Sequence, residues 1–222
     1  MMDDYTAVVP VRDFDKHIDN KNILPFLDTN LLIHKIRTLL AVSRISSIVI
    51  YTESNNLKKI ALSQKGVKVL DRPKSLAKKN TIFNDLVIDI TSRLEETNII
   101  MTNVTCPLVI PNDYIDAIKA YEESLEDGFY SLITVNRVKR YILDDNGPLN
   151  FRKDINSRTL IKPPVFYNLI GAFSIARSSL MKRWKYNWGE IPFMYELAKS
   201  RSVDICTEDD YKIACALATL RS

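Results

Sequence analysis

The stretch AVVPVRDFDKHIDNKNILPF, residues 7–26, decides how the rest of this chain is interpreted. It begins with the apolar run from Ala7 to Val11, which predicts a short buried strand. A polar loop follows, and its cations Arg12, Lys16 and Lys21 can each reach a different oxygen of a polyphosphate. The stretch therefore predicts a strand that ends in a phosphate-binding loop.

Length and composition suit one globular domain. The 222 residues are 46% hydrophobic and 26% charged, which is ordinary for a chain long enough to bury a sizeable core. The net charge of +4 comes from 31 basic and 27 acidic residues mixed along the chain. This excess is too scattered for a nucleic-acid surface, but it is compatible with an anionic substrate. We predict one domain over residues 1–222 and no nucleic-acid partner.

Cysteine usage and hydrophobicity predict the compartment. Cys106, Cys206 and Cys215 are too widely spaced for a disulfide framework or a zinc site. The N-terminus carries Asp3 and Asp4, and no apolar stretch is long enough for a signal core or a membrane span. These features predict a cytoplasmic protein that has no membrane partner.

Strand and helix patterns alternate through the first 135 residues, which predicts a sheet built from strand-helix-strand units. The expected strands after the first are residues 47–52, 67–70, 98–102 and 129–135. The expected helices are residues 30–42, 55–65 and 82–94, and one that begins at Pro111. The tail predicts strands at 193–197 and 202–206 and a last helix capped by Thr207. The fold class is therefore α/β, with a mostly parallel sheet and flanking helices.

The pattern changes at residues 136–165. The turn Asp144-Asp145-Asn146-Gly147-Pro148 predicts a hairpin, and a polar excursion through Lys162, Pro163 and Pro164 follows it. Excursions of this kind are often lids or subunit contacts. Farther on, Trp184 and Trp188 either stack on a base or sugar or pack at a subunit contact, and we favour the contact.

Several landmarks together resemble the acylneuraminate cytidylyltransferase family, which includes CMP-sialic acid synthetases and is related to the CMP-Kdo synthetases. The similarity covers nearly the whole chain, and the landmarks occur in family order. They are Arg12 with Lys21-Asn22, then Arg72-Pro73, the turn NVTCPLV at residues 103–109, the strand GAFSI at residues 171–175, and DICTEDD at residues 204–210.

The resemblance implies a Rossmann-like nucleotidyltransferase of the GT-A-like type. Such an enzyme joins CMP from CTP to an acidic sugar, releases pyrophosphate and uses Mg²⁺. It implies a homodimer joined through residues 136–165 and a role in surface glycan biosynthesis. The residues it assigns are Arg12, Lys16 and Lys21 to catalysis and nucleotide binding; Asn22, Arg72 and Asn84 to nucleotide binding; Asn103, Thr105 and Arg158 to acceptor binding; and Asp204 to the metal.

The chain also departs from the family pattern. Cys206 replaces the second aspartate of the closing pair, and a thiol is a poor ligand for Mg²⁺. Either Asp204 carries the metal with Asp210 or substrate oxygens, or activity is weak. Val109 and Ile170 replace an arginine and an asparagine of the family's sugar site, so we expect an acceptor other than sialic acid.

Two alternatives to transfer onto an acidic sugar follow from these departures. One keeps the reaction but changes the acceptor to a non-sugar acid, such as a phosphonate. The other is a catalytically silent member that binds nucleotide or a partner enzyme as a scaffold. For Arg12, Lys16 and Lys21 the competing interpretation is a solvated loop, which is the usual place of surface lysines.

Overall fold

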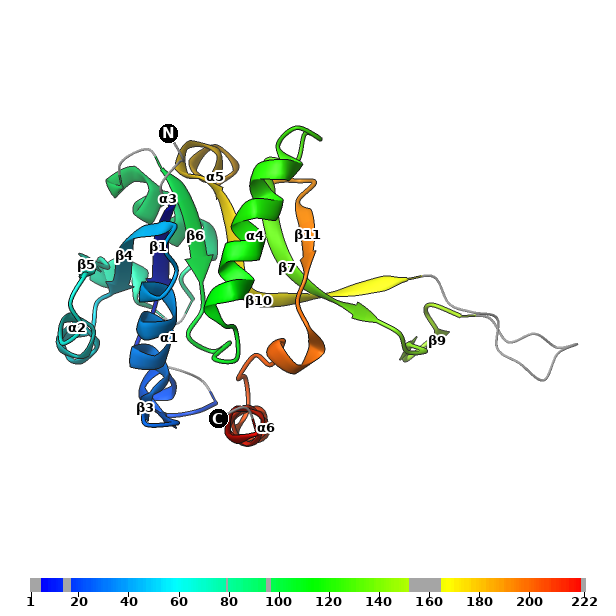
Figure 1. Cartoon of the computed structure of the whole chain (residues 1–222), viewed down its shortest axis with the longest axis horizontal. Helices are drawn as coiled ribbons and strands as arrows, with labels where there is room; N and C mark the ends of the chain where they lie inside the picture. The colour runs from blue at the N-terminus through cyan, green and yellow to red at the C-terminus, as the bar shows by residue number, and fades with distance from the viewer. Residues whose placement is uncertain (1–4, 14–16, 79, 95–96, 152–164, 221–222) are drawn as a thin grey trace, which may run out of the picture.

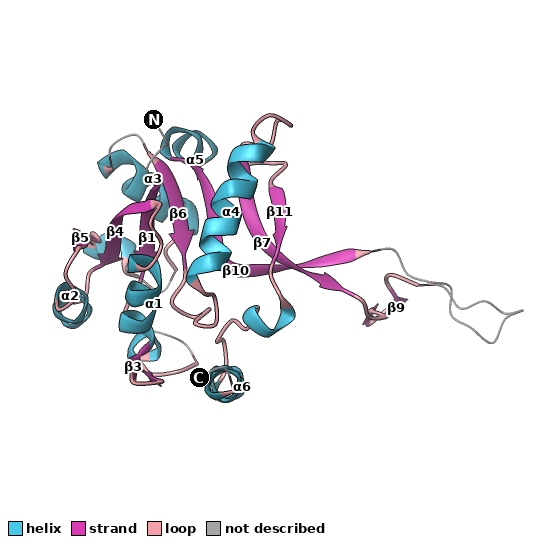
Figure 2. Cartoon of the chain, in the orientation of Figure 1, coloured by secondary structure: helices cyan, strands magenta, loops and turns pink. Residues whose placement is uncertain are grey.

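The computed structural model describes residues 5–13, 17–78, 80–94, 97–151 and 165–220. Its centre is a seven-stranded sheet in the order β11-β7-β10-β6-β1-β4-β5 (Figures 1 and 2). All neighbouring strands in it run parallel except β10, which is antiparallel to both β6 and β7. The strands are β1 (Tyr5–Pro10), β4 (Ile45–Thr52), β5 (Val67–Asp71), β6 (Asn98–Thr102), β7 (Ser131–Val138), β10 (Phe166–Arg177) and β11 (Phe193–Glu196). The predicted fold class is confirmed.

The strand order explains where a ligand can bind. From β1 the chain proceeds outward through β4 to β5, and β6 then pairs with the other side of β1. Val8 of β1 accordingly has Val49 of β4 and Met101 of β6 as its two neighbours. Loops that leave adjacent strands in opposite directions open a crevice at the carboxyl ends of those strands.

Helices cover both faces of the sheet, as Figure 2 shows. The larger core contains residues of α1 (Leu31–Leu40), α2 (Asn55–Leu62), α4 (Pro111–Ser124) and α6 (Glu208–Thr219). The smaller core on the opposite face contains residues of α3 (Phe83–Arg93) and α5 (Ser178–Trp184). Because side chains alternate along a strand, Ala7 and Val9 of β1 enter the larger core and Val8 enters the smaller one.

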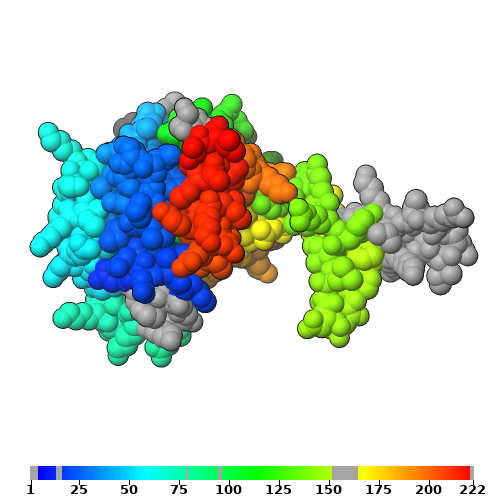
Figure 3. Space-filling model, turned by 90° about the horizontal axis from the view of Figure 1, so that it is seen from below, coloured from blue at the N-terminus to red at the C-terminus, as the bar shows by residue number. Residues whose placement is uncertain are grey.

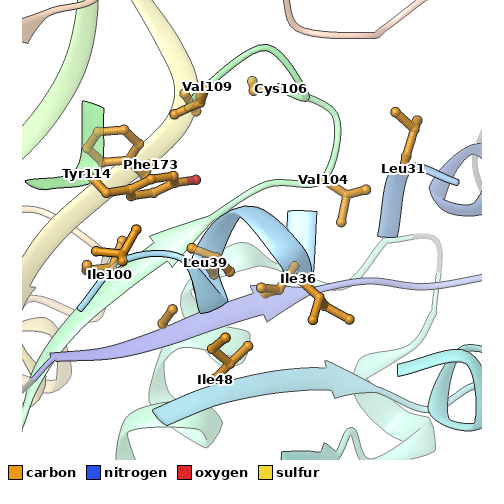
Figure 4. Close-up of a cluster of buried hydrophobic side chains, with 14 of the residues drawn as sticks. Leu31, Ile36, Leu39, Ile48, Ile100, Val104, Cys106, Val109, Tyr114 and Phe173 are labelled. Atoms are coloured by element: carbon orange, nitrogen blue, oxygen red, sulfur yellow. The ribbon is translucent and has the colours of Figure 1, made fainter. Parts of the chain in front are cut away.

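The larger core packs α1 and α4 against the middle of the sheet (Figure 4). Helix α1 forms because apolar residues recur at helical spacing, so that Leu32, Ile36 and Leu39 are all fully buried. Asn30 caps this helix, and its side chain accepts a hydrogen bond from the Ile33 amide at 3.0 Å. In α4 the ring of Tyr114 packs against that of Phe173 at a centroid distance of 4.6 Å.

Strands β7 and β10 extend beyond the body of the molecule as an arm (Figures 1 and 3). Their pairing continues outward to Phe166 and Val138, past a register shift between Leu169 and Ser174. Next to the arm, β8 (Leu143–Asp144) and β9 (Gly147–Pro148) pair around the predicted turn, so the hairpin is confirmed over these residues. Residues 152–164 of the predicted excursion lie outside the described residues.

One prediction for the tail was wrong, and one helix was missed. The strand expected at 202–206 does not form; the short 3-10 helix η3 (Lys199–Arg201) stands before it, and the Ile205 amide makes one hydrogen bond, to the Thr105 carbonyl, at 2.8 Å. This bond holds the segment against the turn after β6 and does not form part of a ladder. Helix α5 was not predicted, because its seven residues are too few for a helical period to stand out.

Within the described part of the chain, no helix combines the length and apolar character needed to cross a membrane.

Candidate functional site

Loops at the carboxyl ends of β1, β5 and β6 enclose a cavity of about 350 Å³, here called the cationic cavity. It brings together residues that are far apart in the sequence but were assigned to one site. The predicted residues in its lining are Arg12, Lys21, Asn22, Arg72, Asn103 and Thr105. The other lining residues are Pro10, Val11, Thr81, Phe83 and Leu86.

The loop after β1 folds back on itself. The Val11 amide still donates to the Tyr51 carbonyl at 3.0 Å, so Arg12 is the first residue beyond the sheet. A short 3-10 helix, η1 (Lys21–Ile23), then returns to it, and the Asn22 side-chain amide donates to the Arg12 carbonyl at 2.7 Å. Asn22 therefore fixes the backbone that carries the first cation, and Lys21 lies beside it in the lining of the same cavity.

Arg72 is the most deeply placed cation of the site, with 6% of its surface exposed. Its guanidinium stacks 4.8 Å from the centroid of the Tyr51 ring, and Nη2 donates to the Tyr51 carbonyl at 3.3 Å. Its Nη1 lies 3.6 Å from Glu53 Oε2. Burial lowers the pKa of this guanidinium, the Glu53 carboxylate opposes that shift, and the Arg12 charge adds to it.

Two residues of the cavity lining carry buried polar atoms that make no hydrogen bond. The Arg72 Nε and the Thr81 hydroxyl have no hydrogen-bond partner among the described residues, and both atoms are shielded by the surrounding protein. Leaving buried polar atoms unpaired costs free energy. What the cavity itself offers a ligand is three cations, Arg12, Lys21 and Arg72, a set that can contact several oxygens of a polyphosphate.

Sequence reasoning missed Thr81, Phe83 and Leu86, which form the side of the cavity made by α3 and the residues before it. The available signal was a threonine directly before the predicted helix at residues 82–94. Asn84, assigned to nucleotide binding, lies in the first turn of α3 and is not part of the described lining. Its role stays a prediction.

A second cavity of about 190 Å³ adjoins the first and is here called the aromatic cavity. Asn103 and Phe83 line both cavities, so the two spaces meet at these residues. The aromatic cavity has no charged side chain among its described lining residues. These are Phe83, Met101, Asn103, Ile133, Leu169, Ile170, Gly171, Phe173, Ser174, Tyr186, Asn187 and Trp188.

Aromatic rings form one wall of this second space. Tyr186 packs edge-on against Phe83 and against Trp188, each at a centroid distance of 5.3 Å. Trp188 thus lies in the lining of a cavity. From the sequence we favoured a subunit contact for this residue, with stacking on a base or sugar as the alternative. Trp184 packs against Gly189, where an added Cβ would lie 2.8 Å from the indole.

Asn103 joins the two cavities and is held in place by β10. Its backbone amide donates to the Ala172 carbonyl at 3.1 Å, and its side-chain amide donates to the Gly171 carbonyl at 2.6 Å. A Cβ placed on Gly171 would lie 3.3 Å from that side-chain amide and 3.5 Å from Asp204 Oδ2. Gly171 therefore preserves a small space that Asn103 and Asp204 both border.

Asp204 is the carboxylate nearest to this junction in the predicted set. It is half-buried, and its neighbour Ile205 ties it to the turn after β6. Burial, and then the Asp204 charge, raise the pKa of the Cys106 thiol. Asp210 serves the helix instead, because its Oδ2 accepts hydrogen bonds from the Cys206 amide at 3.1 Å and the Thr207 amide at 2.8 Å. The Thr207 hydroxyl also donates to this oxygen, at 2.8 Å, and its hydrogen bond, followed by that of the Thr207 amide, lowers the pKa of Asp210.

The donor set around Asp204 suits one kind of metal. Among the described residues, no three His, Cys, Asp or Glu side chains gather where they could hold an ion. Mg²⁺ is commonly held by one or two carboxylates together with water and substrate phosphates, so a single hard oxygen donor beside an open space fits it. A metal that needs a cage built by protein ligands does not fit.

Two predicted residues cannot be placed. Lys16, assigned to catalysis, and Arg158, assigned to acceptor binding, both lie outside the described residues.

Comparison with known proteins assigns this chain to a family. A family model described as cytidylyltransferase matches residues 6–161. This chain belongs to the cytidylyltransferase family. The resemblance stated from the sequence is thereby confirmed.

Curated relatives bear a more specific name. The chain is 26% identical over 217 residues to an N-acylneuraminate cytidylyltransferase of Escherichia coli O18:K1:H7, with 95% of this chain covered. It is 24% identical over 217 residues to an N-acylneuraminate cytidylyltransferase of Streptococcus agalactiae serotype III, with 92% covered. The match covers 51% of each relative, so the chain spans about half their length.

Solved structures share the fold at low sequence identity. A structure of CMP:2-keto-3-deoxy-manno-octonic acid synthetase complexed with CTP matches with a TM-score of 0.71 and 10% identity, covering 99% of this chain and 100% of that one. A 4-diphosphocytidyl-2C-methyl-D-erythritol synthase from Anaerococcus prevotii matches with a TM-score of 0.66 and 12% identity, covering 99% and 97%. At such identity the likeness establishes the fold alone.

Proposed function

We propose that this chain transfers the cytidylyl group of CTP to a hydroxyl of a small anionic acceptor and releases pyrophosphate. The observation that carries the proposal is the cationic cavity, where Arg12, Lys21 and Arg72 from two different loops line one space. Family membership supplies the nucleotide, because the matching family is described as cytidylyltransferase. The acceptor class, surface-glycan role and cytoplasmic location belong to the proposal.

The transfer requires little covalent chemistry from the side chains of the protein. The acceptor hydroxyl loses its proton, its oxygen forms a bond to the α-phosphorus, and the bond from that phosphorus to the pyrophosphate oxygen breaks with its electron pair. Positioning and charge neutralisation dominate such a step. Arg12, Lys21 and Arg72 would hold the phosphates in line and stabilise the charge that develops on the departing pyrophosphate. Lys16 is assigned to the same role.

Mg²⁺ is the cofactor of this proposal, and Asp204 is the residue that would hold it. When bound, the ion would neutralise phosphate charge and help to orient the reacting groups. Asp204 is not among the described lining residues of either cavity, but its Oδ2 would lie 3.5 Å from a Cβ placed on Gly171, so it borders the small space beside Asn103. Its carboxylate can act there without Asp210, whose oxygen is committed to the cap of α6.

In this proposal the two cavities bind different parts of the acceptor. Its anionic group would face the cations of the first cavity, because the described lining of the aromatic cavity has no charge. Its uncharged body would occupy the aromatic cavity, with Asn103 and Thr105 near the reacting hydroxyl. Val109, which replaces the family's arginine, is a core residue at 1% exposure, so it offers no contact to a carboxylate. This supports an acidic acceptor other than sialic acid, with a non-sugar acid such as a phosphonate as the alternative.

Gly171→Ala tests this division. The new Cβ would press on the Asn103 side-chain amide from 3.3 Å, a tighter contact than usual, and so displace the group at the junction. We expect the KM for the acceptor to rise about tenfold while the CTP dissociation constant changes less than about twofold. Overpacking should also cost about 1 kcal/mol of unfolding free energy. Steady-state kinetics and urea titration measure the effects, and an equal loss of CTP affinity would contradict the division.

A homodimer is part of the proposal. The arm and the hairpin beside it expose several large apolar residues, which single chains seldom display together. These are Tyr141, Leu143, Leu149, Val165, Phe166, Tyr167 and Leu169. A second copy would cover them, and light scattering at micromolar concentration would then give twice the mass of one chain.

The direct test of the function uses the chain with CTP, Mg²⁺ and a panel of hydroxyl acids, including acidic sugars and hydroxyphosphonates. We expect pyrophosphate release that depends on both CTP and one of the acids. Calorimetry with CTP and the other common nucleoside triphosphates runs beside it. Binding of CTP without release from any acid would support the catalytically silent alternative. No binding of any nucleotide would overturn both.

A further inference from the structure

A buried lysine that the proposed chemistry does not use contacts the turn at residues 103–109, after β6. Lys35 of α1 has 1% of its surface exposed and is flanked by core residues of the same helix. Burying an ammonium in a core is costly unless its donors are satisfied. Lys35 donates to the Cys106 carbonyl at 3.0 Å and to the Tyr114 hydroxyl at 3.0 Å. Among the described residues, no carboxylate forms an ion pair with it.

The first of these bonds belongs to a set that fixes the turn after β6. Three consecutive carbonyls of the turn each accept a hydrogen bond from outside it. The Ile205 amide donates to Thr105 at 2.8 Å, Lys35 donates to Cys106, and His34 Nε2 donates to Pro107 at 2.9 Å. Adjacent side chains of α1 therefore hold adjacent carbonyls of the turn. This turn carries Asn103 and Thr105 into the cationic cavity.

The second bond, from Lys35 to Tyr114, is the first of a series of hydrogen bonds that ends at β10. Lys35 donates to Tyr114, and the Tyr114 hydroxyl lies 2.8 Å from the Thr102 hydroxyl. Thr102 in turn donates to the Ala172 carbonyl at 2.8 Å. Because the one proton of Thr102 goes to Ala172, the Tyr114 proton must go to Thr102, and the Tyr114 oxygen is left to accept from Lys35. The last link lies next to Gly171, where Asn103 is bonded.

Helix α1 also follows directly from the phosphate loop. The Leu31 amide at its start donates to the Leu24 carbonyl at 3.0 Å, just beyond η1 with Lys21 and Asn22. The ammonium of Lys35 thus connects three parts of the site: the helix after the phosphate loop, the turn after β6 and the end of β10. Figure 4 shows Cys106 and Tyr114 above α1 in the same buried cluster.

We propose that Lys35 is a positioning residue, which locks the turn at residues 103–109 to α1 and β10 so that Asn103 and Thr105 keep their place between the two cavities. The ammonium does more than fill space, because an apolar residue there would leave the buried Cys106 carbonyl without this donor. What the ammonium adds is two hydrogen bonds of fixed direction. The acceptor readout below rests on the proposed function.

Lys35→Met tests the proposal, because methionine preserves length and burial and removes both hydrogen bonds. Thr38→Val is the matched control: Thr38 is buried in the same helix, and its hydroxyl donates within that helix, to the His34 carbonyl at 2.9 Å. We expect backbone amides of residues 103–109 to exchange hydrogen about tenfold faster in Lys35→Met and unchanged in Thr38→Val. The KM for the acceptor should rise about tenfold, and the KM for CTP should change less than about twofold.

Several outcomes decide the matter. Unchanged exchange in the turn of Lys35→Met would overturn the proposal, and so would an equal rise in both KM values. If Lys35→Met does not fold, Tyr114→Phe removes one of the two hydrogen-bond acceptors at nearly constant volume, and the same pattern at smaller amplitude is expected. If the unaltered chain binds no CTP, the proposed function fails, while the exchange measurement still decides whether Lys35 positions the turn.

Discussion

Arg12→Gln should weaken CTP binding about ten- to a hundredfold, because hydrogen bonds to charged groups contribute about 1.5–3 kcal/mol and each 1.4 kcal/mol is a factor of ten. Arg12 is the first residue beyond the sheet and lines the cationic cavity together with Lys21 and Arg72. Glutamine is shorter and uncharged but still polar, so the unfolding free energy should change by less than about 0.5 kcal/mol. Calorimetry with CTP and urea titration measure the two effects.

Arg37→Gln is the matched control for this experiment. Arg37 is an exposed arginine of α1 whose ion pair with Asp28, at 2.8 Å, is also exposed. Such surface pairs contribute little, so the variant should bind CTP as the unaltered chain does. Equal losses in both variants would mean that overall charge, not the cavity, attracts the nucleotide. An unaffected Arg12→Gln variant would remove the phosphate loop from the proposal.

Asp204→Asn should lower kcat for pyrophosphate release about a thousandfold, since losing the Mg²⁺ contribution of about 4 kcal/mol corresponds to a factor of that size. Asparagine keeps the shape of the side chain beside Gly171 and Asn103 but loses the charge. Binding of CTP without Mg²⁺ should change less than about twofold, because the cations of the first cavity remain. The measurement is a Mg²⁺ titration of pyrophosphate release at saturating CTP.

Asp209→Asn provides the comparison from the same acidic segment. Asp209 is exposed and forms an ion pair with Lys212 at 3.1 Å, so its loss should leave both kcat and Mg²⁺ dependence unaltered. Asp210 is unsuitable as a control because it caps α6. A Mg²⁺ requirement that survives in Asp204→Asn would show that the metal does not need this carboxylate.

The fold could be predicted from the sequence because, in the first half of the chain, strands rich in β-branched residues alternate with helices whose apolar residues recur at clear helical spacing. The pattern for β6 gave residues 98–102, which is the strand observed. The helix at 82–94 differs from α3 by one residue at each end. The strand predicted in the tail does not form: Ser202 to Cys206 has a strand-like composition, but the segment lies against a turn, and Ile205 is the residue whose amide donates to a carbonyl of that turn.

The candidate site was predictable only where a motif carries it. Arg12, Lys21 and Arg72 could be grouped because family order brings them to one edge of the sheet. Thr81 and Lys35 could not be found in that way, since their importance depends on packing. Among the described residues the buried Thr81 hydroxyl has no hydrogen-bond partner, and Lys35 looks like one more surface lysine until α1 docks on the turn. Trp188, from the loop after α5, was singled out in the sequence, but its place in a cavity lining was not the alternative that we favoured.

The placement of β10 has a consequence for how such a scaffold can diversify. The cations that we propose to hold the triphosphate follow β1 and β5, whereas the wall of the aromatic cavity stands largely on β7, β10 and the loop after α5. Under this proposal, substitutions in the second group would change which acceptor is cytidylylated without weakening nucleotide binding. New acceptors would then arise from changes in one half of the molecule, and Asn103 would be the lining residue that both halves share.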